Sequence, residues 1–283
     1  MSTIALGNFD GVHIAHKVVL LTAARQGDSI CLLFRKHPLE VMTGKPPQKL
    51  LSVQDTKEKI LACGIKRVEY LDFESVKDLT PQAFFGTVLL ARFKADCICC
   101  GYNYTFGKDR AGTAKTLEAL CEKAGVRLIV APKTEYEGEA VSSSRIRHCI
   151  AAGELEAANA MLGYPFFFEA TVVQGKKLGR KLGFPTINQY LPAEIVHPRA
   201  GVYLSNVTVD GKVYRGLTNI GNNPTVGGEQ FRSETYLFGF DGELYGKTAK
   251  TELLRFIREE RKFESIEALR AQVLEDMERA KNV

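Results

Sequence analysis

The spacing of apolar residues changes near residue 163, and this change most constrains how the chain can fold. Up to about residue 160, short apolar runs of strand length alternate with longer amphipathic segments of helix length. Such alternation builds a parallel sheet with helices on its faces. Beyond residue 163, short β-rich segments are separated by Gly, Asn and Pro turns, which is typical of a small all-β unit. The sequence therefore predicts two domains, residues 1–160 and 163–283, with the seam at Leu162-Gly163-Tyr164-Pro165.

The expected elements follow from these patterns. In the first domain we expect buried strands at residues 4–6, 30–34, 68–71, 97–100 and 126–130, and helices near residues 16–26, 55–63, 81–93 and 113–124. Gly27 and Gly125 are expected to end helices, and Thr80-Pro81 to begin one. In the second domain we expect strands at residues 168–173, 202–209, 214–220 and 234–240, a hairpin turn at Asp210-Gly211, and a C-terminal helix near residues 265–280.

Composition narrows the class of protein. With 45% hydrophobic and 25% charged residues, the chain has the balance of a globular protein. No apolar run approaches the roughly 20 residues that span a bilayer, and the N-terminus lacks the pattern of a secretion signal. The net charge of +5 is mild and its basic residues are dispersed, which suits anionic small molecules better than nucleic acid. We expect a cytoplasmic protein with small-molecule substrates and no nucleic-acid or membrane partner; no oligomeric state is indicated.

The chain contains seven cysteines. Cys97 and Cys100 have metal-like spacing, but they lie with Cys99 in a short apolar run, and no second Cys-x-x-Cys completes a zinc site. Ordinary core packing is therefore expected, and the odd count argues against a disulfide framework.

The segment Gly183-Phe184-Pro185-Thr186-Ile187-Asn188 predicts two oxygen-bearing side chains on one strand. Pro185 marks the start or edge of a strand because it fixes φ and donates no hydrogen bond. Thr186 and Asn188 alternate with Ile187, so on an extended backbone both point to the same side. Just upstream, residues 175–183 are glycine-rich and strongly cationic. Together they form a candidate site for a nucleoside triphosphate and magnesium; a basic surface hairpin is an equally consistent alternative.

A second candidate site follows the first expected strand, at Gly7-Asn8-Phe9-Asp10-Gly11-Val12-His13-Ile14-Ala15-His16. A strand, a glycine-bracketed turn and a helix form the nucleotide-binding edge of α/β sheets. His13 and His16 would share a face of the first helical turn, where the helix N-terminus already favours an anion. Because the chain has only five histidines, this pair favours a phosphate site over two surface histidines that cap a helix.

Two further segments resemble phosphate sites. Residues 142–147, Ser-Ser-Ser-Arg-Ile-Arg, have the pattern of a helix N-cap followed by an arginine that could hold a phosphate. By itself, this segment favours a helix cap with a solvated arginine over a phosphate site. Residues 101–108 only superficially resemble a P-loop, because the spacing is too long and Asp109 replaces the required Ser or Thr.

These motifs together resemble a known family. His13-Ile14-Ala15-His16 resembles the HxGH signature of the nucleotidyltransferase superfamily, and residues 142–147 resemble its later Ser–Arg motif. With the Gly-Phe-Pro-Thr-x-Asn segment, the order of motifs resembles bacterial bifunctional riboflavin kinase/FMN adenylyltransferases, the prokaryotic FAD synthetases, over essentially the full length. The resemblance implies an α/β nucleotidyltransferase (Rossmann-like) N-terminal domain and an all-β barrel riboflavin kinase domain with a C-terminal helix.

The resemblance also implies two reactions: ATP phosphorylates riboflavin to FMN, and a second ATP adenylylates FMN to FAD, releasing pyrophosphate. It implies Mg²⁺ as cofactor, Thr186 and Asn188 as metal ligands, and Glu234, His13 and His16 as catalytic residues. The ATP-binding residues that it implies are Gly7, Asn8, Phe9, Asp10, His13, His16, Ser144, Arg147, Gly175, Lys181, Gly183, Thr186 and Asn188. Without the resemblance, Glu234 is merely an acidic residue at a strand start, for which solvation is the default expectation.

Departures from the family pattern concern mainly the first domain. Ala15 stands where the family has glycine, and Asn103 replaces an expected aspartate. Near Glu234, Tyr236 and Gly239 stand where histidine and aspartate are expected. One alternative is therefore a riboflavin kinase whose first domain binds nucleotide with weak or no adenylyl transfer. Another is a flavin- or nucleotide-sensing regulator that contacts RNA through residues 175–183, although no aromatic stacking motif accompanies them.

Overall fold

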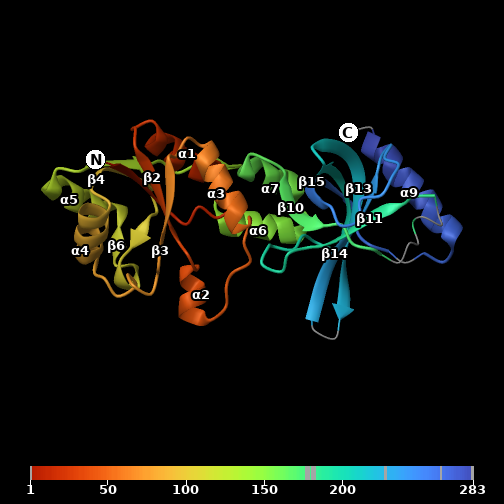
Figure 1. Cartoon of the computed structure of the whole chain (residues 1–283), viewed down its shortest axis with the longest axis horizontal. Coiled ribbons are helices and arrows are strands. Elements are labelled where there is room, and N and C mark those ends of the chain that lie inside the picture. Colours follow the sequence, from red (N-terminus) through yellow and green to blue (C-terminus); the bar gives the residue numbers. More distant parts are fainter. Residues whose placement is uncertain (1, 176–178, 180–182, 226–227, 262, 282–283) are drawn as a thin grey trace. The chain divides into compact units, whose positions relative to one another are not determined.

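The computed structural model of the 283-residue chain describes residues 2–175, 179, 183–225, 228–261 and 263–281 (Figure 1). Its contacts divide the chain into two compact units, Met1–Ser143 and Ser144–Val283. The division comes before the two helices that precede the expected seam at residues 162–165.

The first unit is built on a parallel sheet. Its strands are β1 (Ser2–Leu6), β2 (Ser29–Phe34), β3 (Arg67–Leu71), β4 (Ala95–Gly101) and β7 (Arg127–Ala131). The order across the sheet is β3-β2-β1-β4-β7, and every neighbouring pair is parallel. The order reverses between β1 and β4, which is the topological switch point where such sheets bind ligands.

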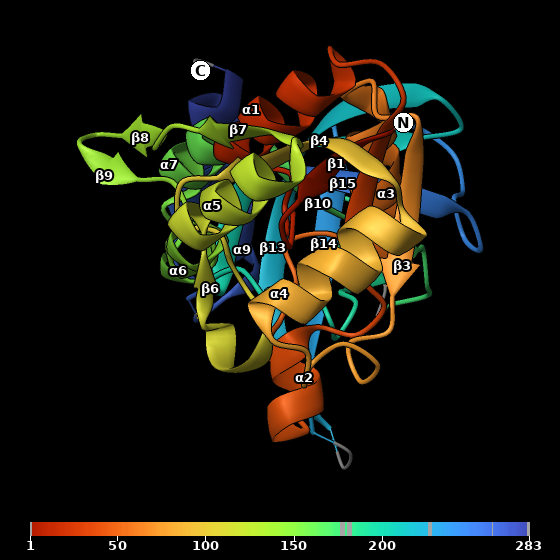
Figure 2. The same ribbon diagram turned by 90° about the vertical axis from the view of Figure 1, so that its left-hand side faces the viewer.

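Helices connect these strands and cover both faces of the sheet (Figures 1 and 2). They are α1 (Ile14–Ala24), α2 (Pro38–Thr43), α3 (Val53–Ala62), α4 (Pro81–Ala83), the π-helix η1 (Phe84–Arg92), the 3₁₀ turn η2 (Lys108–Arg110) and α5 (Ala114–Ala124). Two short hairpins, β5 (Thr105–Phe106) with β6 (Gly112–Thr113) and β8 (Glu135–Tyr136) with β9 (Glu139–Ala140), complete the unit.

The helix boundaries agree closely with the sequence signals. The Thr80 hydroxyl accepts from Ala83 N–H at 3.2 Å, so Thr80 caps α4 as expected. Gly125 is the C-cap of α5 with φ of 67°, whereas α1 ends at Ala24 with Arg25 as its C-cap, two residues before Gly27. The helix expected over residues 81–93 is mostly π-helical, and its last N–H, on Phe93, donates to Val88 O, five residues back.

The expected core cysteines lie in the sheet. Cys97, Cys99 and Cys100 are all buried on β4. Burial raises the pKa of the Cys99 and Cys100 thiols to about 12, so both stay protonated at neutral pH. Their alternation along the strand places Cys100 with Ile98 in the core cluster that η1 and α5 cover. The thiols therefore fill space between the sheet and its helices.

The second unit is built on an antiparallel sheet. Its strands are β10 (Phe166–Thr171), β11 (Thr186–Tyr190), β12 (Gly201–Val209), β13 (Lys212–Thr225), β14 (Gly228–Leu237) and β15 (Thr248–Arg258). The order is β10-β15-β12-β13-β14-β11, with every neighbouring pair antiparallel, and the sheet curls as Figure 1 shows. Asp210 and Gly211 form the hairpin turn between β12 and β13, as predicted. Strand β15 was not expected from the sequence.

Two helices open this unit and pack within it. They are α6 (Ser143–Ala152), which begins at the last residue of the first unit, and α7 (Leu155–Leu162). Asn159 on α7 donates to Leu253 O at 2.9 Å and accepts from Phe166 N–H at 2.7 Å. This one amide joins α7 to both β15 and the start of β10.

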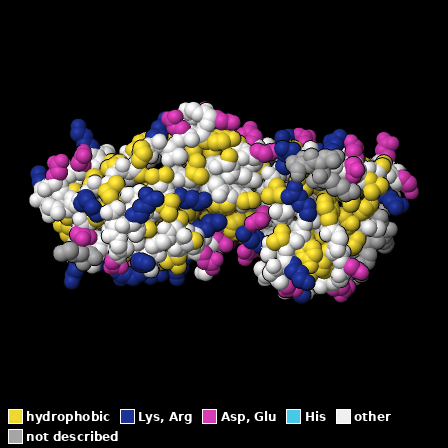
Figure 3. Space-filling model, turned by 90° about the horizontal axis from the view of Figure 1, so that it is seen from above, with side chains coloured by type: hydrophobic (Ala, Val, Ile, Leu, Met, Phe, Trp, Pro, Cys, Tyr) yellow, Lys and Arg dark blue, Asp and Glu magenta, His cyan; other side chains and the backbone are white. Residues whose placement is uncertain are grey.

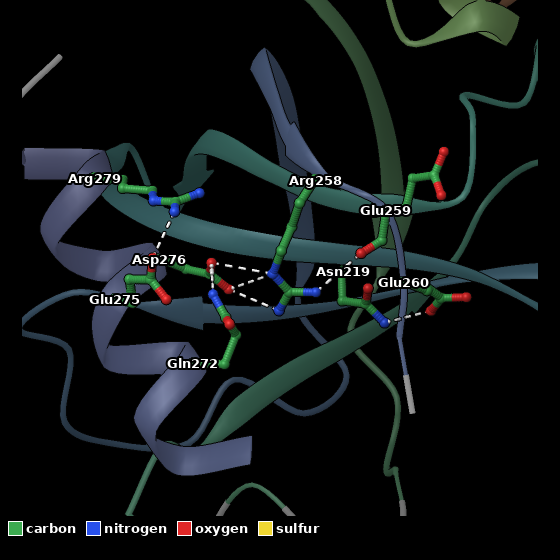
Figure 4. Close-up of polar contacts among 8 residues, drawn as sticks. All are labelled: Asn219, Arg258, Glu259, Glu260, Gln272, Glu275, Asp276 and Arg279. Atoms are coloured by element: carbon green, nitrogen blue, oxygen red, sulfur yellow. Dashed lines mark hydrogen bonds and ion pairs between the residues drawn. The ribbon is translucent and has the colours of Figure 1, made fainter. Parts of the chain in front are cut away.

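The C-terminal helix α9 (Ile266–Lys281) covers an outer face of the curled sheet. There Met277 packs against a buried cluster of Val202, Leu204 and Leu217. Arg258 at the end of β15 donates to both carboxylate oxygens of Asp276 on α9, at 2.7–3.1 Å (Figure 4). The expected fold, a parallel α/β unit followed by a curled all-β unit with a terminal helix, is confirmed.

Candidate active sites

The first candidate site is the turn between β1 and α1, at the switch point of the parallel sheet. Three of its residues have positive φ: Phe9 (50°), Gly11 (83°) and Val12 (36°). Non-glycine residues rarely adopt this region, so the two at Phe9 and Val12 mark a turn held by its surroundings. A Cβ on Gly7 would lie 2.9 Å from the Phe9 ring, so the absence of a side chain at Gly7 lets that ring pack beneath the turn.

The buried Phe9 ring supports the two histidines of the turn. Its edge meets the His16 ring with centroids 5.2 Å apart. His13 is the N-cap of α1, and its Nδ1 accepts from the backbone N–H of His16 at 3.3 Å. In a neutral imidazole this leaves the ring proton on Nε2 of His13. Hydrogen-bond donors therefore collect at the first turn of α1, where backbone N–H groups and the helix dipole also favour an anion.

His16 is held neutral by its surroundings. Burial, and then the neighbouring His13 ring, lower the pKa of His16 well below its usual value. Its Nδ1 is buried without a hydrogen-bond partner in the described part of the chain. The His16 ring is therefore neutral, and a neutral imidazole can donate one ring hydrogen bond to a phosphate oxygen.

Asp10 joins the turn to the segment that enters α3. Its Oδ1 accepts from the backbone N–H of Leu50 at 2.9 Å, and its carbonyl accepts from the Ser143 hydroxyl at 2.9 Å. Asn8, by contrast, is exposed. Asp10 thus fixes the shape of the turn, while Asn8 lies open to solvent.

The second candidate site is a row of polar side chains across three strands of the curled sheet. Asn188 on β11 pairs directly with Glu234 on β14, and Glu234 pairs with Asn219 on β13. Residues directly opposite in antiparallel strands point to the same face. Thr186 lies on that face too, two residues from Asn188, and it pairs with Tyr236. The face is the outer one, since Leu217, which pairs with Tyr236, belongs to the cluster that α9 covers.

Glu234 has partners along this row. It forms an ion pair with Arg232, which lies two residues away on the same strand face. Next to it, the Asn219 amide donates to Glu260 at 2.8 Å (Figure 4). The Glu234 side chain is 38% exposed, so a ligand on this face can reach its carboxylate.

Two glycines of the preceding loop lie directly against Thr186 and Asn188. A Cβ on Gly175 would be 2.5 Å from Asn188 Oδ1, and one on Gly179 would be 2.4 Å from Phe184 O and 3.4 Å from Thr186 Oγ1. Any side chain at Gly175 would therefore displace the Asn188 amide. Gly183, which ends the loop, has φ of 83°, a value that glycine adopts without strain.

Asn188 carries an oxygen with no assigned partner. It is only 5% exposed, and its Oδ1 is buried without a hydrogen-bond partner among the described residues. Buried polar atoms are normally paired, so such an atom points to a ligand. Neutral amide and hydroxyl oxygens are ligands that Mg²⁺ accepts alongside water and phosphate, and the pair Thr186 and Asn188 fits that ion.

Comparison with known proteins decides the family. A family model described as FAD synthetase matches residues 1–145, and one described as riboflavin kinase matches residues 162–283. The bifunctional riboflavin kinase/FMN adenylyltransferase of Bacillus subtilis is 35% identical over 291 residues, covering 99% of this chain and 91% of the relative. That of Escherichia coli K12 is 33% identical over 285 residues, covering 96% and 90%. The chain belongs to the bifunctional riboflavin kinase/FMN adenylyltransferase family.

A solved structure has the same fold over the whole chain. It is described as a macrolide-efflux protein from Streptococcus pneumoniae, and it matches with a TM-score of 0.92 at 31% identity, covering 100% of this chain and 94% of that one. Among the described residues, no helix of this family member has the length and apolar character needed to cross a bilayer. On the face drawn in Figure 3, acidic and basic side chains are interspersed, as the dispersed charges of the sequence led us to expect.

The family resemblance expected from the sequence is confirmed, and the structure places most of the expected site residues. Gly7, Asn8, Phe9, Asp10, His13 and His16 come together in one turn, and Gly175, Gly183, Thr186, Asn188 and Glu234 surround one face of the second sheet. Ser144 and Arg147 lie on α6, in the second compact unit, and Lys181 lies outside the described residues. The roles of all these residues remain predictions.

The sequence did not identify several residues that surround these positions. Asn219 and Arg232 are neighbours of Glu234 only through strand pairing and a side-chain contact. Glu260 lies 41 residues from its partner Asn219. The one local signal was the position of Arg232, two residues before the expected base Glu234, because residues two apart on a strand share a face.

Proposed function

We infer that each unit carries one step of FAD synthesis. The second unit phosphorylates riboflavin with ATP, and the first transfers the adenylyl group of another ATP to FMN, releasing pyrophosphate. The observation that carries this inference is that each unit, matched by its own family model, has a separate polar site: the histidine turn in one and the Asn188–Glu234 row in the other.

In the second unit, Glu234 is proposed to act as the base. Its carboxylate would accept the proton of the riboflavin 5′-hydroxyl as that oxygen bonds to the γ-phosphorus of ATP and the bond to the ADP oxygen breaks. Thr186 and Asn188 would hold Mg²⁺, which neutralises phosphate charge when bound. Gly175 and Gly179 let the backbone of the loop approach these two side chains.

In the first unit, alignment is the main requirement. A phosphate oxygen of FMN attacks the α-phosphorus of ATP, and the bond to pyrophosphate breaks. The stacked His13 and His16 would donate hydrogen bonds to phosphate oxygens, where negative charge grows during transfer. The family motif also implies Ser144 and Arg147 as triphosphate-binding residues, and these two belong to α6 of the second unit. Ala15 on α1 stands where the HxGH signature has glycine. The measured rate of FAD formation from FMN will show whether this difference limits adenylyl transfer.

A single assay tests the division of labour. The full chain is incubated with riboflavin, ATP and Mg²⁺, and the flavins are separated by chromatography; FAD is the expected product. Glu234→Ala should lower FMN formation about 10²–10⁴-fold, the usual effect of losing a general base, yet still convert added FMN to FAD. His13→Ala with His16→Ala should do the reverse.

Glu156→Ala serves as the matched control. Glu156 is an exposed carboxylate on α7 that pairs with Arg255 on β15, and it lies off the polar row. The substitution should leave both activities unchanged. If either active-site substitution stops both reactions in a folded protein, the assignment of one reaction to each unit is wrong. Accumulation of FMN alone by the unmodified chain would instead support a kinase with an inactive first unit.

A further inference from the structure

The curled sheet of the second unit is closed by very few contacts between its edge strands. In the described ranges, no ladder joins β10 to β11; a single bridge pairs Val173, just after β10, with Asn188. In it, Val173 N–H donates to Asn188 O at 2.8 Å. The strand that carries the proposed metal ligands is therefore held on that side by one backbone pair and by side chains.

The side chain that joins these edges is Gln189, which is fully buried. Its Nε2 donates to Ala170 O on β10 and to Ala249 O on β15, both at 2.8 Å. Its Oε1 accepts from the Thr251 hydroxyl, also at 2.8 Å. Because carbonyls can only accept, the amide must present its nitrogen to them, and this orientation also suits Thr251.

Gln189 is directly next to Asn188 but on the opposite face of β11. Successive side chains of a strand point to opposite faces, so Gln189 points into the sheet's interior while Asn188 points outward to the polar row. Fixing one side chain on three partners therefore limits rotation of the strand about its axis. That rotation would move the Asn188 oxygen away from its neighbours on the outer face.

We propose that Gln189 is a positioning residue of the kinase site, which acts by holding β11 so that Asn188 presents its oxygen to the metal–nucleotide complex. This inference rests on the proposed role of Asn188. Residues that orient metal ligands from behind typically change metal affinity about 10–100-fold when they are replaced. Gln189 supplies this support through the backbone, without contacting the ligand itself.

The test is the magnesium dependence of ADP binding, measured calorimetrically without turnover. All variants are made in the full chain carrying His13→Ala and His16→Ala, so that nucleotide binding at the first unit is suppressed. Gln189→Met keeps the length of the side chain but removes its donors. It should raise the magnesium concentration for half-maximal ADP binding about 10–100-fold, with riboflavin binding changed less than about twofold. Half-saturation within about twofold of the parent would overturn the proposal.

Ser205→Ala is the matched control. Ser205 is also fully buried inside the sheet and donates to Gly216 O at 3.1 Å, but it lies on the central strand β12. Its replacement removes interior hydrogen bonds to Gly216 O and, at 2.7 Å, to the Thr218 hydroxyl, neither of which lies on β11, so magnesium dependence should stay at the parent value. An equal effect of Ser205→Ala and Gln189→Met would show general loosening of the sheet and overturn the proposal.

A double-mutant cycle identifies the route of the effect. If Gln189 acts through Asn188, adding Gln189→Met to Asn188→Ala should raise the magnesium concentration for half-maximal ADP binding little further. Full additivity of the two effects overturns the proposal. If Asn188→Ala alone leaves this magnesium concentration unchanged, the assignment of Asn188 as a metal ligand is wrong. If Asn188→Ala raises it and Gln189→Met does not, only the positioning role of Gln189 is wrong. Should Gln189→Met not fold, Thr251→Val removes just one partner of Gln189 and must produce a smaller shift in the same direction.

Discussion

The imidazole rings of His13 and His16 stack with their centroids 3.5 Å apart and their planes at 16°. Burial disfavours charge on His16, and two cationic rings at this distance would in addition repel each other. The pKa of His16 is accordingly well below its usual value. A histidine that is neutral when folded but protonates readily when unfolded makes stability depend on pH.

The first prediction is an acid-sensitive first unit. Because the folded pKa of His16 lies below the unfolded value of about 6.5, its contribution to stability is intact above that pH and is lost as pH falls toward the folded value. The melting temperature should therefore fall between about pH 7.5 and about pH 5.5, as calorimetry would show. His16→Asn should reduce this fall, whereas substitution of the exposed His148 by Asn should not. An unchanged fall in His16→Asn would contradict the prediction.

The second prediction concerns the link between Asp10 and Leu50. Leu50 is 1% exposed and its N–H donates to Asp10 Oδ1, so Asp10→Ala leaves a buried donor unpaired. Stability of the first unit should fall by about 1–3 kcal/mol in urea unfolding, and FAD formation from FMN should fall with it. Asp10→Asn retains an acceptor oxygen and should keep most of the stability. Equal losses in both variants would show that the carboxylate charge, not the hydrogen bond, supports the turn.

The sequence predicted those elements whose signals are local. The central strand around Ile98 and the cap at Thr80 were located by apolar spacing and by a single hydroxyl before proline. The packing of α7 against β15 was not predictable, because Asn159 finds its partner Leu253 94 residues away. The π-helical hydrogen bonding that ends at Phe93 was missed because apolar spacing predicts a helix without distinguishing its hydrogen-bond pattern.

The active sites were predicted unevenly for the same reason. Thr186 and Asn188 could be placed on one side of a strand from their alternation, and the structure agrees. That Asn188 faces Glu234 depends on strand register over 46 positions, which no local pattern contains. On α9, the most buried of the described residues is the charged Asp276, whose partner Arg258 lies on β15, and no local pattern contains that pairing.

The third prediction uses the close approach of Gly175 to Asn188. Gly175→Ala would place a methyl carbon 2.5–2.6 Å from the Asn188 amide, so the amide must move. Riboflavin kinase activity should fall at least about tenfold, in line with the loss on misplacing a positioned group by about 1 Å, while FAD formation from FMN is unchanged. Gly86→Ala is the control, because its Cβ meets nothing within 4 Å and its helical backbone accepts alanine. Normal kinase activity in Gly175→Ala would show that Asn188 is not needed in its present position.

The last prediction contrasts two neighbouring carboxylates on α9 (Figure 4). Asp276 is 1% exposed and binds Arg258 through both oxygens, whereas Glu275 forms an exposed pair with Arg279 on the same helix. Removing one partner of a buried pair leaves an uncompensated charge, so Asp276→Ala should lower unfolding free energy by about 3–5 kcal/mol.

Glu275→Ala should cost no more than about 0.5 kcal/mol, as for exposed helix pairs. Urea unfolding measures both changes, and limited proteolysis should show α9 cleaved early only in Asp276→Ala. Combining Asp276→Leu with Arg258→Met should recover much of the loss, because an apolar pair of similar volume leaves no buried charge. Equal stability of the two alanine variants would mean that the Arg258–Asp276 pair does not hold α9 against the sheet, and that the apolar contacts of Met277 alone do.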